Sequence, residues 1–225
     1  MGHAIREMMD DRNHELLPLD DIVEVDEACV GGAPKCLSGA YNPPGKGSGK
    51  PLVFVAASRD GQARAKVVSD DQRATLEPVL AGWIVSDDIT LMTDGSTSYL
   101  GIGEMMEEHY RVIHSQHEYA NPETGADVNT AEAVIAQVQR ALFGVYHNLG
   151  SKHLQRYLDE IVWRWNHREP AREVFKQWTT KSGALRKKTR VIWRPIPVLA
   201  QMRVLLQGAV GKQIRRSKEY GLCWP

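Results

Sequence analysis

The sequence lacks any run of about 18 apolar residues, the length that a membrane-spanning helix needs. Its first ten residues mix Arg6, Glu7 and Asp10 with apolar side chains, so the basic-then-apolar layout of a signal peptide is missing. Internal repeats are absent as well. These absences favour a cytoplasmic protein with no membrane partner, and 225 residues allow one domain with an appendage or two small domains.

Cysteine is scarce, with three residues in the chain: Cys29, Cys36 and Cys223. An odd number without a CxxC pair argues against both a disulfide framework and a zinc ribbon. We therefore expect ordinary reduced thiols.

The net charge is zero, but the two signs are unevenly distributed along the chain. Residues 1–163 hold 13 Lys and Arg against 25 Asp and Glu, and residues 164–225 hold 15 against 3. The two parts therefore carry −12 and +12. Such asymmetry indicates a nucleic-acid partner for the basic part, although the two parts can also attract each other.

Hydrophobic periodicity divides the acidic part into alternating elements. Strand patterns cover residues 21–27, 52–58, 63–68, 88–93 and 110–113, and helical patterns cover 5–17, 71–83, 96–108, 129–143 and 151–166. After the first helix the order is β-β-β-α-β-α-β-α, which is that of the RNase H-like fold. We expect a mixed five-stranded sheet flanked by helices over residues 21–168, after a helical lead-in at 1–20.

Residues 169–225 are expected to form a basic extension. A Lys and Arg cluster lies before residue 195, and residues 198–206 have an apolar stripe at helical spacing. The stripe predicts that this helical extension packs against its own domain or against another subunit.

Three carboxylates have positions that suit phosphodiester chemistry. Asp26 lies in the first strand, Asp94 ends the fourth, and Glu132 opens the helix at 129–143. The first and fourth strands of an RNase H-like sheet are neighbours, and that helix crosses them. Two Mg²⁺ ions about 3.5–4 Å apart can then activate an attacking oxygen and stabilise a leaving one.

Each of these residues also has a purely structural interpretation. Asp94 with Gly95 can be only a turn, and Asp26 beside Glu27 can be a solvated strand end. Asn129 and Glu132 have the spacing of a capping box, with Asn129 as N-cap. Only the combination with the order of elements favours catalysis.

Five motifs occur in a fixed order: VEVDEACVGG (23–32), TDGSTSY (93–99), HSQHEYA (114–120), NTAE (129–132) and GVYHNLGSKHLQRYLDEIVWRWNHR (144–168). Together they resemble bacterial insertion-sequence DDE transposases of the ISXO-like, Merlin-related group. The resemblance covers roughly residues 3–168 and implies an RNase H-like fold, two divalent cations (Mg²⁺ or Mn²⁺) and a cut-and-join reaction on transposon ends. It implies Asp26, Asp94 and Glu132 as catalytic metal ligands, with Asn129 as the alternative third residue.

The chain departs from this family at several places. Relatives usually have an aromatic residue near Cys29, a His where Asp127 stands and often a Lys where Gln139 stands, although Arg140 follows. Many also carry a zinc-ribbon region ahead of the catalytic domain. These departures keep open a decayed or domesticated remnant that binds DNA without turnover.

Several basic residues are candidates for DNA contacts. The stretch GKGSGK (45–50) lacks the flanking residues of a phosphate-binding loop and precedes a strand, so a loop that touches the DNA backbone is preferred. Lys152 and Arg156 are four residues apart on one predicted helix face, which is either a DNA contact or solvated. The predicted contacts are Lys46, Lys50, Arg140, Lys152, Arg156, Arg186, Lys187, Lys188 and Arg190.

We therefore predict a DNA transposase that acts on transposon ends and target DNA, located in the cytoplasm and on the nucleoid when bound. Two ends must be joined, so a homo-oligomer is expected in the synaptic complex. An RNase H-like nuclease or resolvase, which cuts without joining, is the alternative enzyme.

Overall fold

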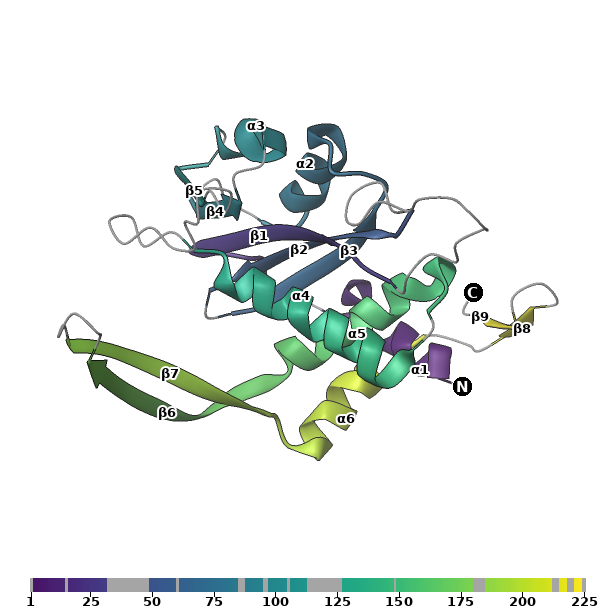
Figure 1. Ribbon diagram of the computed structural model, residues 1–225. Coiled ribbons are helices and arrows are strands. Elements are labelled where there is room, and N and C mark those ends of the chain that lie inside the picture. The colour runs from purple at the N-terminus through teal and green to yellow at the C-terminus, as the bar shows by residue number, and fades with distance from the viewer. Residues whose placement is uncertain are drawn as a thin grey trace, which may run out of the picture.

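Three apolar segments near the start of the chain pair as antiparallel strands. In the computed structural model these are β1 (Ile22–Cys29), β2 (Leu52–Ser58) and β3 (Ala63–Val68), and β4 (Thr90–Asp94) and β5 (Glu108–Val112) extend the sheet in parallel beyond β1. The order is β3-β2-β1-β4-β5 (Figure 1). The structure describes residues 2–14, 16–31, 49–59, 61–84, 88–94, 97–104, 106–112, 127–147, 149–179, 185–211, 215–217 and 221–223. The predicted mixed five-stranded sheet is confirmed.

Helices cover both faces of this sheet (Figure 1). One face packs against α4 (Asn129–Ala141) and α5 (Leu154–Asn166), and the other against α2 (Arg73–Ala81) and the short α3 (Leu100–Gly103). A π-helical turn (Leu142–Tyr146) follows α4, and 3-10 turns precede α3 (Thr97–Tyr99) and α5 (Ser151–His153). This is the layered arrangement that the order of elements predicted.

Side-chain alternation in β1 assigns its residues to the two faces. Val23 and Val25 are fully buried in the core with α2 and α3. Glu24 and Asp26, at the intervening positions, are directed toward α4. An acidic pair is thus placed beneath a helix by strand geometry alone.

Two predicted helices are shorter in the structure. The segment 96–108 forms only the 3-10 turn and α3, because the chain turns tightly into β5: a Cβ at Gly103 would lie 1.9 Å from Nδ1 of His109. The segment 5–17 forms α1 (Gly2–Met8) and a 3-10 turn (Asp11–Asn13). Gly101 and Gly103 weaken the helical propensity of the first of these segments.

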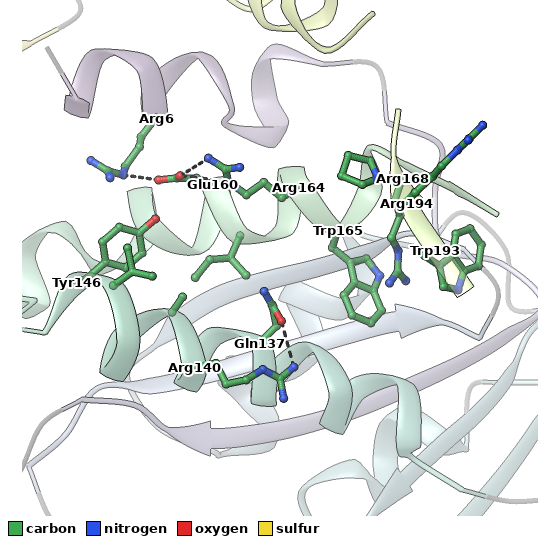
Figure 2. A pocket seen from close by; sticks show the side chains of 14 residues that line it. Arg6, Gln137, Arg140, Tyr146, Glu160, Arg164, Trp165, Arg168, Trp193 and Arg194 are labelled. Atoms are coloured by element: carbon green, nitrogen blue, oxygen red, sulfur yellow. Dashed lines mark hydrogen bonds and ion pairs between the residues drawn. The ribbon is translucent and has the colours of Figure 1, made fainter. Parts of the chain in front are cut away.

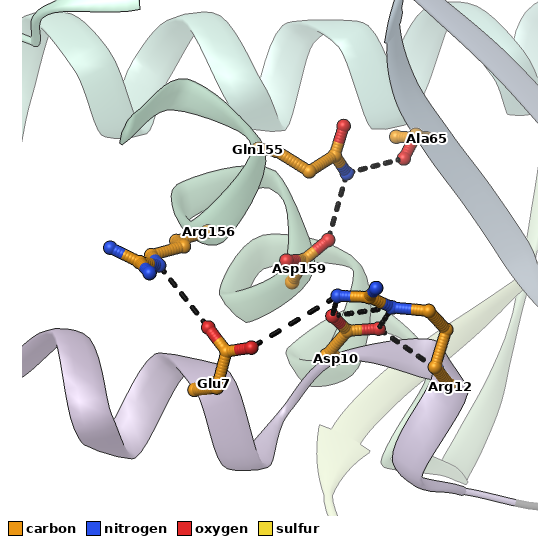
Figure 3. Close-up of polar contacts among 7 residues, drawn as sticks. All are labelled: Glu7, Asp10, Arg12, Ala65, Gln155, Arg156 and Asp159. Atoms are coloured by element: carbon orange, nitrogen blue, oxygen red, sulfur yellow. Dashed lines mark hydrogen bonds and ion pairs between the residues drawn. The ribbon is translucent and has the colours of Figure 1, made fainter. Parts of the chain in front are cut away.

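The N-terminal helix docks onto α5 through ion pairs. Arg6 Nε lies 2.7 Å from Glu160 Oε2, and Arg164 Nη2 lies 2.9 Å from Glu160 Oε1 (Figure 2). Arg156 Nε lies 3.2 Å from Glu7 Oε2 (Figure 3). The lead-in thus packs against the sheet-covering helices.

The edge of the sheet at β3 is covered by amides from α5. Gln155 bonds the carbonyl of Ala65 at 3.0 Å and the backbone N–H of Val67 at 2.9 Å. Asn166 bonds both backbone groups of Ala63, at 2.8 and 3.0 Å. These bonds satisfy an edge that would otherwise be open to pairing with another strand.

The prediction that the extension is helical was wrong for its first half. Strands β6 (Arg168–Thr179) and β7 (Leu185–Pro195) form an antiparallel hairpin that extends away from the sheet (Figure 1). The segment has no helical stripe, but β-branched and aromatic residues such as Val174, Val191 and Trp193 favour strands. Two short strands, β8 (Arg215–Ser217) and β9 (Gly221–Cys223), pair nearer the end of the chain.

The helix predicted at 198–206 is present as α6 (Val198–Gln207). Its C-terminal end meets α1, since a Cβ at Gly208 would lie 2.2 Å from the carbonyl oxygen of Met8. Val198, Leu199 and Met202 nevertheless remain exposed. A subunit contact for this stripe therefore stays a prediction. No helix in the described ranges has the length and apolar character to cross a bilayer.

Candidate active site

Asp26 and Asp94 lie on neighbouring parallel strands. The register of β1 and β4 pairs Val25 with Thr93, so Asp26 and Asp94 are the next residues along the two strands. Carboxylate oxygens of Asp26, Glu27 and Asp94 all lie within 4.8 Å of one another. The fold thus brings together two carboxylates that are distant in sequence, as predicted, and adds a third.

Glu27 is the member of this group that the sequence did not point to. Alternation in β1 places it on the face opposite Asp26, where the buried phenol of Tyr99 donates a hydrogen bond to Glu27 Oε2. Burial, followed by the charge of Glu27, raises the pKa of Tyr99, so the phenol stays a donor. Tyr99 belongs to the TDGSTSY motif, which was the one available signal for this contact.

The carboxyl group of Asp26 resists ionisation in this setting. Burial is the largest cause, and the charges of Glu27, Asp94 and Glu132 add to it, against a lowering hydrogen bond of 2.8 Å from the Glu27 amide. Together these raise the pKa of Asp26 to about 7. A cation among these oxygens would remove the repulsion between them.

Glu132 lies in the first turn of α4 and is exposed. Its charge acts on Asp26, but among the described residues the group within 4.8 Å consists of Asp26, Glu27 and Asp94. The third predicted carboxylate thus lies on the adjoining helix, close enough for its charge to act on Asp26 but outside this group.

Glu24 fixes the start of α4 against β1. Its side chain is fully buried and accepts bonds from the hydroxyl of Thr130 at 3.0 Å and the amide of Ala131 at 3.2 Å, and also from the amide of Thr130. The carboxylate therefore satisfies N–H groups that the helix itself leaves without partners. Because Glu132 follows directly, this contact sets its distance from Asp26.

Arg59 completes that anchor. Its Nε lies 2.9 Å from Glu24 Oε1, and its Nη2 lies 3.3 Å from Asp127 Oδ1. Asp127, where relatives usually have His, is therefore held by an ion pair just before α4. The Asp at this position therefore has an ion-pair partner in this chain, Arg59.

Asn129 is the first residue of α4 rather than its N-cap. The N-cap is Val128, and the amide of Asn129 donates to Asp127 Oδ1 at 3.2 Å. The capping-box interpretation of Asn129 and Glu132 is therefore wrong, because Glu24 takes over the helix start. Asn129 is exposed beside the site, and its role as an alternative third residue stays a prediction.

The donor set suits a hard divalent cation. Each of the three grouped residues offers a carboxylate oxygen, and Mg²⁺ and Mn²⁺ prefer oxygen ligands, whereas Zn²⁺ sites usually include nitrogen or sulfur. The raised pKa of Asp26 is the further sign of a fit, since it reflects crowded negative charge.

The predicted DNA contacts lie in several environments. Arg140 is exposed at the end of α4 and bonds Gln137 at 3.0 Å, and Arg156 is held by Glu7. Lys152 is exposed in the turn before α5, and Lys50 is half-buried just before β2. Lys46 lies outside the described residues. Arg186, Lys187, Lys188 and Arg190 are described only by their backbone, in β7. Their roles stay predictions.

Comparison with known proteins extends these observations. No curated protein and no solved structure matches the chain. The family model for the ISXO2-like transposase domain matches residues 18–166, a range that contains all five sheet strands, α4, α5 and the acidic group. The chain therefore belongs to the family of ISXO2-like transposase domains.

Proposed function

We propose that this chain is an active transposase that cleaves DNA at insertion-sequence ends and joins the ends to target DNA. Asp26, Asp94 and Glu132 would hold the divalent cations, with residues 21–168 as the catalytic domain. Membership of a transposase family supports the general activity. The observation that carries the specific proposal is the convergence of the Asp26 and Asp94 oxygens.

The proposal covers two successive reactions at one site. Hydrolysis breaks the phosphodiester bond at the transposon end and frees a 3′-hydroxyl. That hydroxyl then attacks a target phosphodiester, forms a new ester bond and displaces the 3′-oxygen of the target strand, which leaves as a hydroxyl. When bound, two Mg²⁺ or Mn²⁺ ions supply the Lewis acidity for both reactions. The chain contributes carboxylates on rigid strands, and the buried Glu24–Arg59 pair keeps α4 and Glu132 in position.

Four basic residues of the extension, Arg186, Lys187, Lys188 and Arg190, would hold the DNA. Phosphate contacts of this kind weaken steeply with salt. Two copies would assemble so that both transposon ends can be joined together. The exposed stripe of α6 offers an apolar surface for such an assembly.

A strand-transfer assay tests the proposal. A labelled duplex from the DNA that flanks the coding sequence, pre-cut at its 3′ end, is incubated with a target plasmid and Mg²⁺ or Mn²⁺. We expect a covalently joined product from the wild type and none from Asp94→Asn.

The same assay separates the alternatives. Hydrolysis without joined product would indicate a nuclease or resolvase. DNA binding with neither product, in both metals, would indicate a decayed remnant and overturn the proposal.

A further inference from the structure

A cavity of about 750 Å³ lies between α4, α5 and the root of the β6–β7 hairpin (Figure 2). This volume is within the range of about 300–1,000 Å³ typical of small-molecule pockets. Its described charged lining consists of Arg6, Arg140, Arg164, Arg168, Arg194 and Glu160. The cavity is therefore strongly basic and separate from the acidic group.

Only part of this positive charge is balanced. Arg6 and Arg164 share Glu160, and Arg194 pairs with Glu169 at 2.8 Å. Arg140 bonds the neutral amide of Gln137. Within the described part of the chain, neither Arg140 nor Arg168 pairs with a carboxylate. Two arginines thus bring uncompensated charge to the cavity.

Arg168 is held between two indole rings. Its guanidinium carbon lies 3.4 Å from the ring centroid of Trp165 and 4.7 Å from that of Trp193. Burial lowers the pKa of Arg168 to about 10, so it stays protonated at neutral pH. A partly buried cation without a carboxylate is a position that an anionic ligand would stabilise.

We propose that this cavity binds single-stranded DNA, with a phosphodiester at Arg168 and Arg140 and an unstacked base against Trp193. Arginine beside an aromatic ring matches the two parts of a nucleotide, its anionic phosphate and its flat base. The bases of an intact duplex are stacked on each other, so an indole within a cavity is reached only by a base that has left the stack. The inference takes DNA as ligand from the proposed function and adds a second site.

Helix α4 connects this cavity to the acidic group. Glu132, Ala136 and Arg140 are spaced by four residues and share one face of α4. Eight residues of helix span about 12 Å, which is the rise of roughly three or four base pairs along duplex DNA. A strand that leaves the acidic group along α4 would enter the cavity close to the point of cleavage.

Fluorescence anisotropy in EDTA tests the inference without any catalytic step. The probe is a labelled oligothymidylate of about 15 nucleotides, compared with a duplex of the same length. We expect Arg168→Gln and Trp193→Ala each to weaken binding of the single strand by at least about fivefold, and the duplex by less. Trp193→Phe should retain most of the affinity, and Arg168→Gln should reduce the slope of log affinity against log salt by about 0.7.

Two variants keep the test decisive. Arg203→Gln removes the same charge from the exposed face of α6, outside the cavity, and should change affinity less than about twofold. Arg140→Gln alters an exposed residue, so it remains informative if Arg168→Gln does not fold. The inference would be overturned if the cavity variants bound the single strand as tightly as Arg203→Gln does. It would also be overturned if the cavity variants lost equal affinity for the single strand and for the duplex.

This binding measurement does not depend on whether the protein joins DNA. In an Asp94→Asn background, Arg168→Gln should weaken binding of the single strand by the same factor as in the wild type. If no DNA is ever joined but this sensitivity persists, the cavity assignment stands and the transposase proposal fails. If DNA is joined but this sensitivity is absent, the transposase proposal stands and the cavity assignment fails.

Discussion

Two acidic clusters in this molecule each contain a carboxyl group whose pKa is raised to about 7. One is Asp26 in β1, and the other is Asp159 in α5, on the side that faces α1 (Figure 3). In both, burial is the largest cause and neighbouring carboxylates add to it. By their titration alone the two clusters are equivalent candidates for a functional site.

The second group, the α1 cluster, consists of Glu7, Asp10, Asp11 and Asp159 and has arginines around it. Arg156 pairs with Glu7, Arg12 with Asp10, and Arg64 lies 3.7 Å from Asp11. Its negative charge is therefore largely neutralised by the chain itself.

The surroundings of Asp26 differ. The Tyr99 phenol donates to Glu27 and the Glu27 amide donates to Asp26, and both of these donors are neutral. Of the described acidic residues, only the group around Asp26 converges closely enough to share a cation. A perturbed pKa therefore marks buried negative charge, and it is the convergence of oxygens that indicates metal binding.

The largest effect is expected from removing one carboxylate of each cluster. Asp94→Asn should lower metal-dependent DNA cleavage by at least about a thousandfold, because it removes a ligand of the cations that stabilise the transition state. Asp159→Asn should leave the rate within about threefold, since its cluster is neutralised by arginines. Single-turnover cleavage of end-containing duplexes measures both rates. If Asp94→Asn and Asp159→Asn lowered the cleavage rate equally, the claim that only the group around Asp26 binds the catalytic cations would be wrong.

Glu24→Gln tests the anchor next to the acidic group. The amide cannot replace the buried carboxylate that Arg59 and the start of α4 share, so the free energy of unfolding should fall by about 2–3 kcal/mol. Cleavage should fall by about 10- to 100-fold in protein that is still folded, because Glu132 loses its fixed position. Urea denaturation and the cleavage assay give the two values.

The matched control for this anchor is Glu77→Gln. Glu77 pairs with Arg73 on the surface of α2 at 2.9 Å. Exposed pairs of this type contribute at most about 1 kcal/mol, so both readouts should stay near wild type. A Glu24→Gln protein with normal stability would contradict the role assigned to this buried contact.

Measuring thermal stability at several pH values compares Asp26 and Asp159, the two residues whose pKa is raised to about 7. The folded chain binds the Asp26 proton more tightly than the unfolded chain does, so the destabilisation by Asp26 grows as pH rises from about 4 to about 7. In EDTA, Asp26→Asn should therefore raise the melting temperature above pH 7, by about 2–4 °C per kcal/mol, and change it little at about pH 4. Asp159→Asn should show the same pH dependence.

Added Mg²⁺ then separates the two variants. Millimolar Mg²⁺ should raise the melting temperature of the wild type and of Asp159→Asn, because a cation that binds only the folded chain stabilises it. Asp26→Asn should not respond. Differential scanning fluorimetry measures these shifts, and a response of Asp26→Asn equal to wild type would place the cation elsewhere.

The sheet was predictable because its order depends on local patterns. Alternation marks each strand, and short turns or helices connect them, so the adjacency of Asp26 and Asp94 follows from the order. Glu27 was not predictable in this way, since alternation places it on the opposite face and its approach depends on Tyr99. Local periodicity carries no information about such a contact.

Long-range contacts also explain the error at the start of α4. Asn129 and Glu132 satisfy a local capping pattern, but Glu24, 106 residues before Thr130, supplies the acceptor instead. The hairpin was missed for a related reason. Its Lys and Arg residues dominated the composition of the segment and obscured the alternation of its β-branched and aromatic residues.

The smallest predicted effects concern two basic residues, Lys152 in the turn before α5 and Arg156 in the first turn of α5. Arg156 belongs to the neutralised α1 cluster, so Arg156→Gln should lower the free energy of unfolding by about 0.5–1 kcal/mol through loss of the Glu7 pair. Lys152 is exposed, so Lys152→Gln should change the free energy of unfolding by less than about 0.5 kcal/mol and weaken duplex DNA binding by about twofold at low salt. Urea denaturation and anisotropy on the same two proteins measure both quantities. The opposite result would be a Lys152→Gln protein that loses stability and an Arg156→Gln protein that loses only DNA affinity. It would show that Arg156 contacts DNA and that its ion pair with Glu7 contributes little to stability.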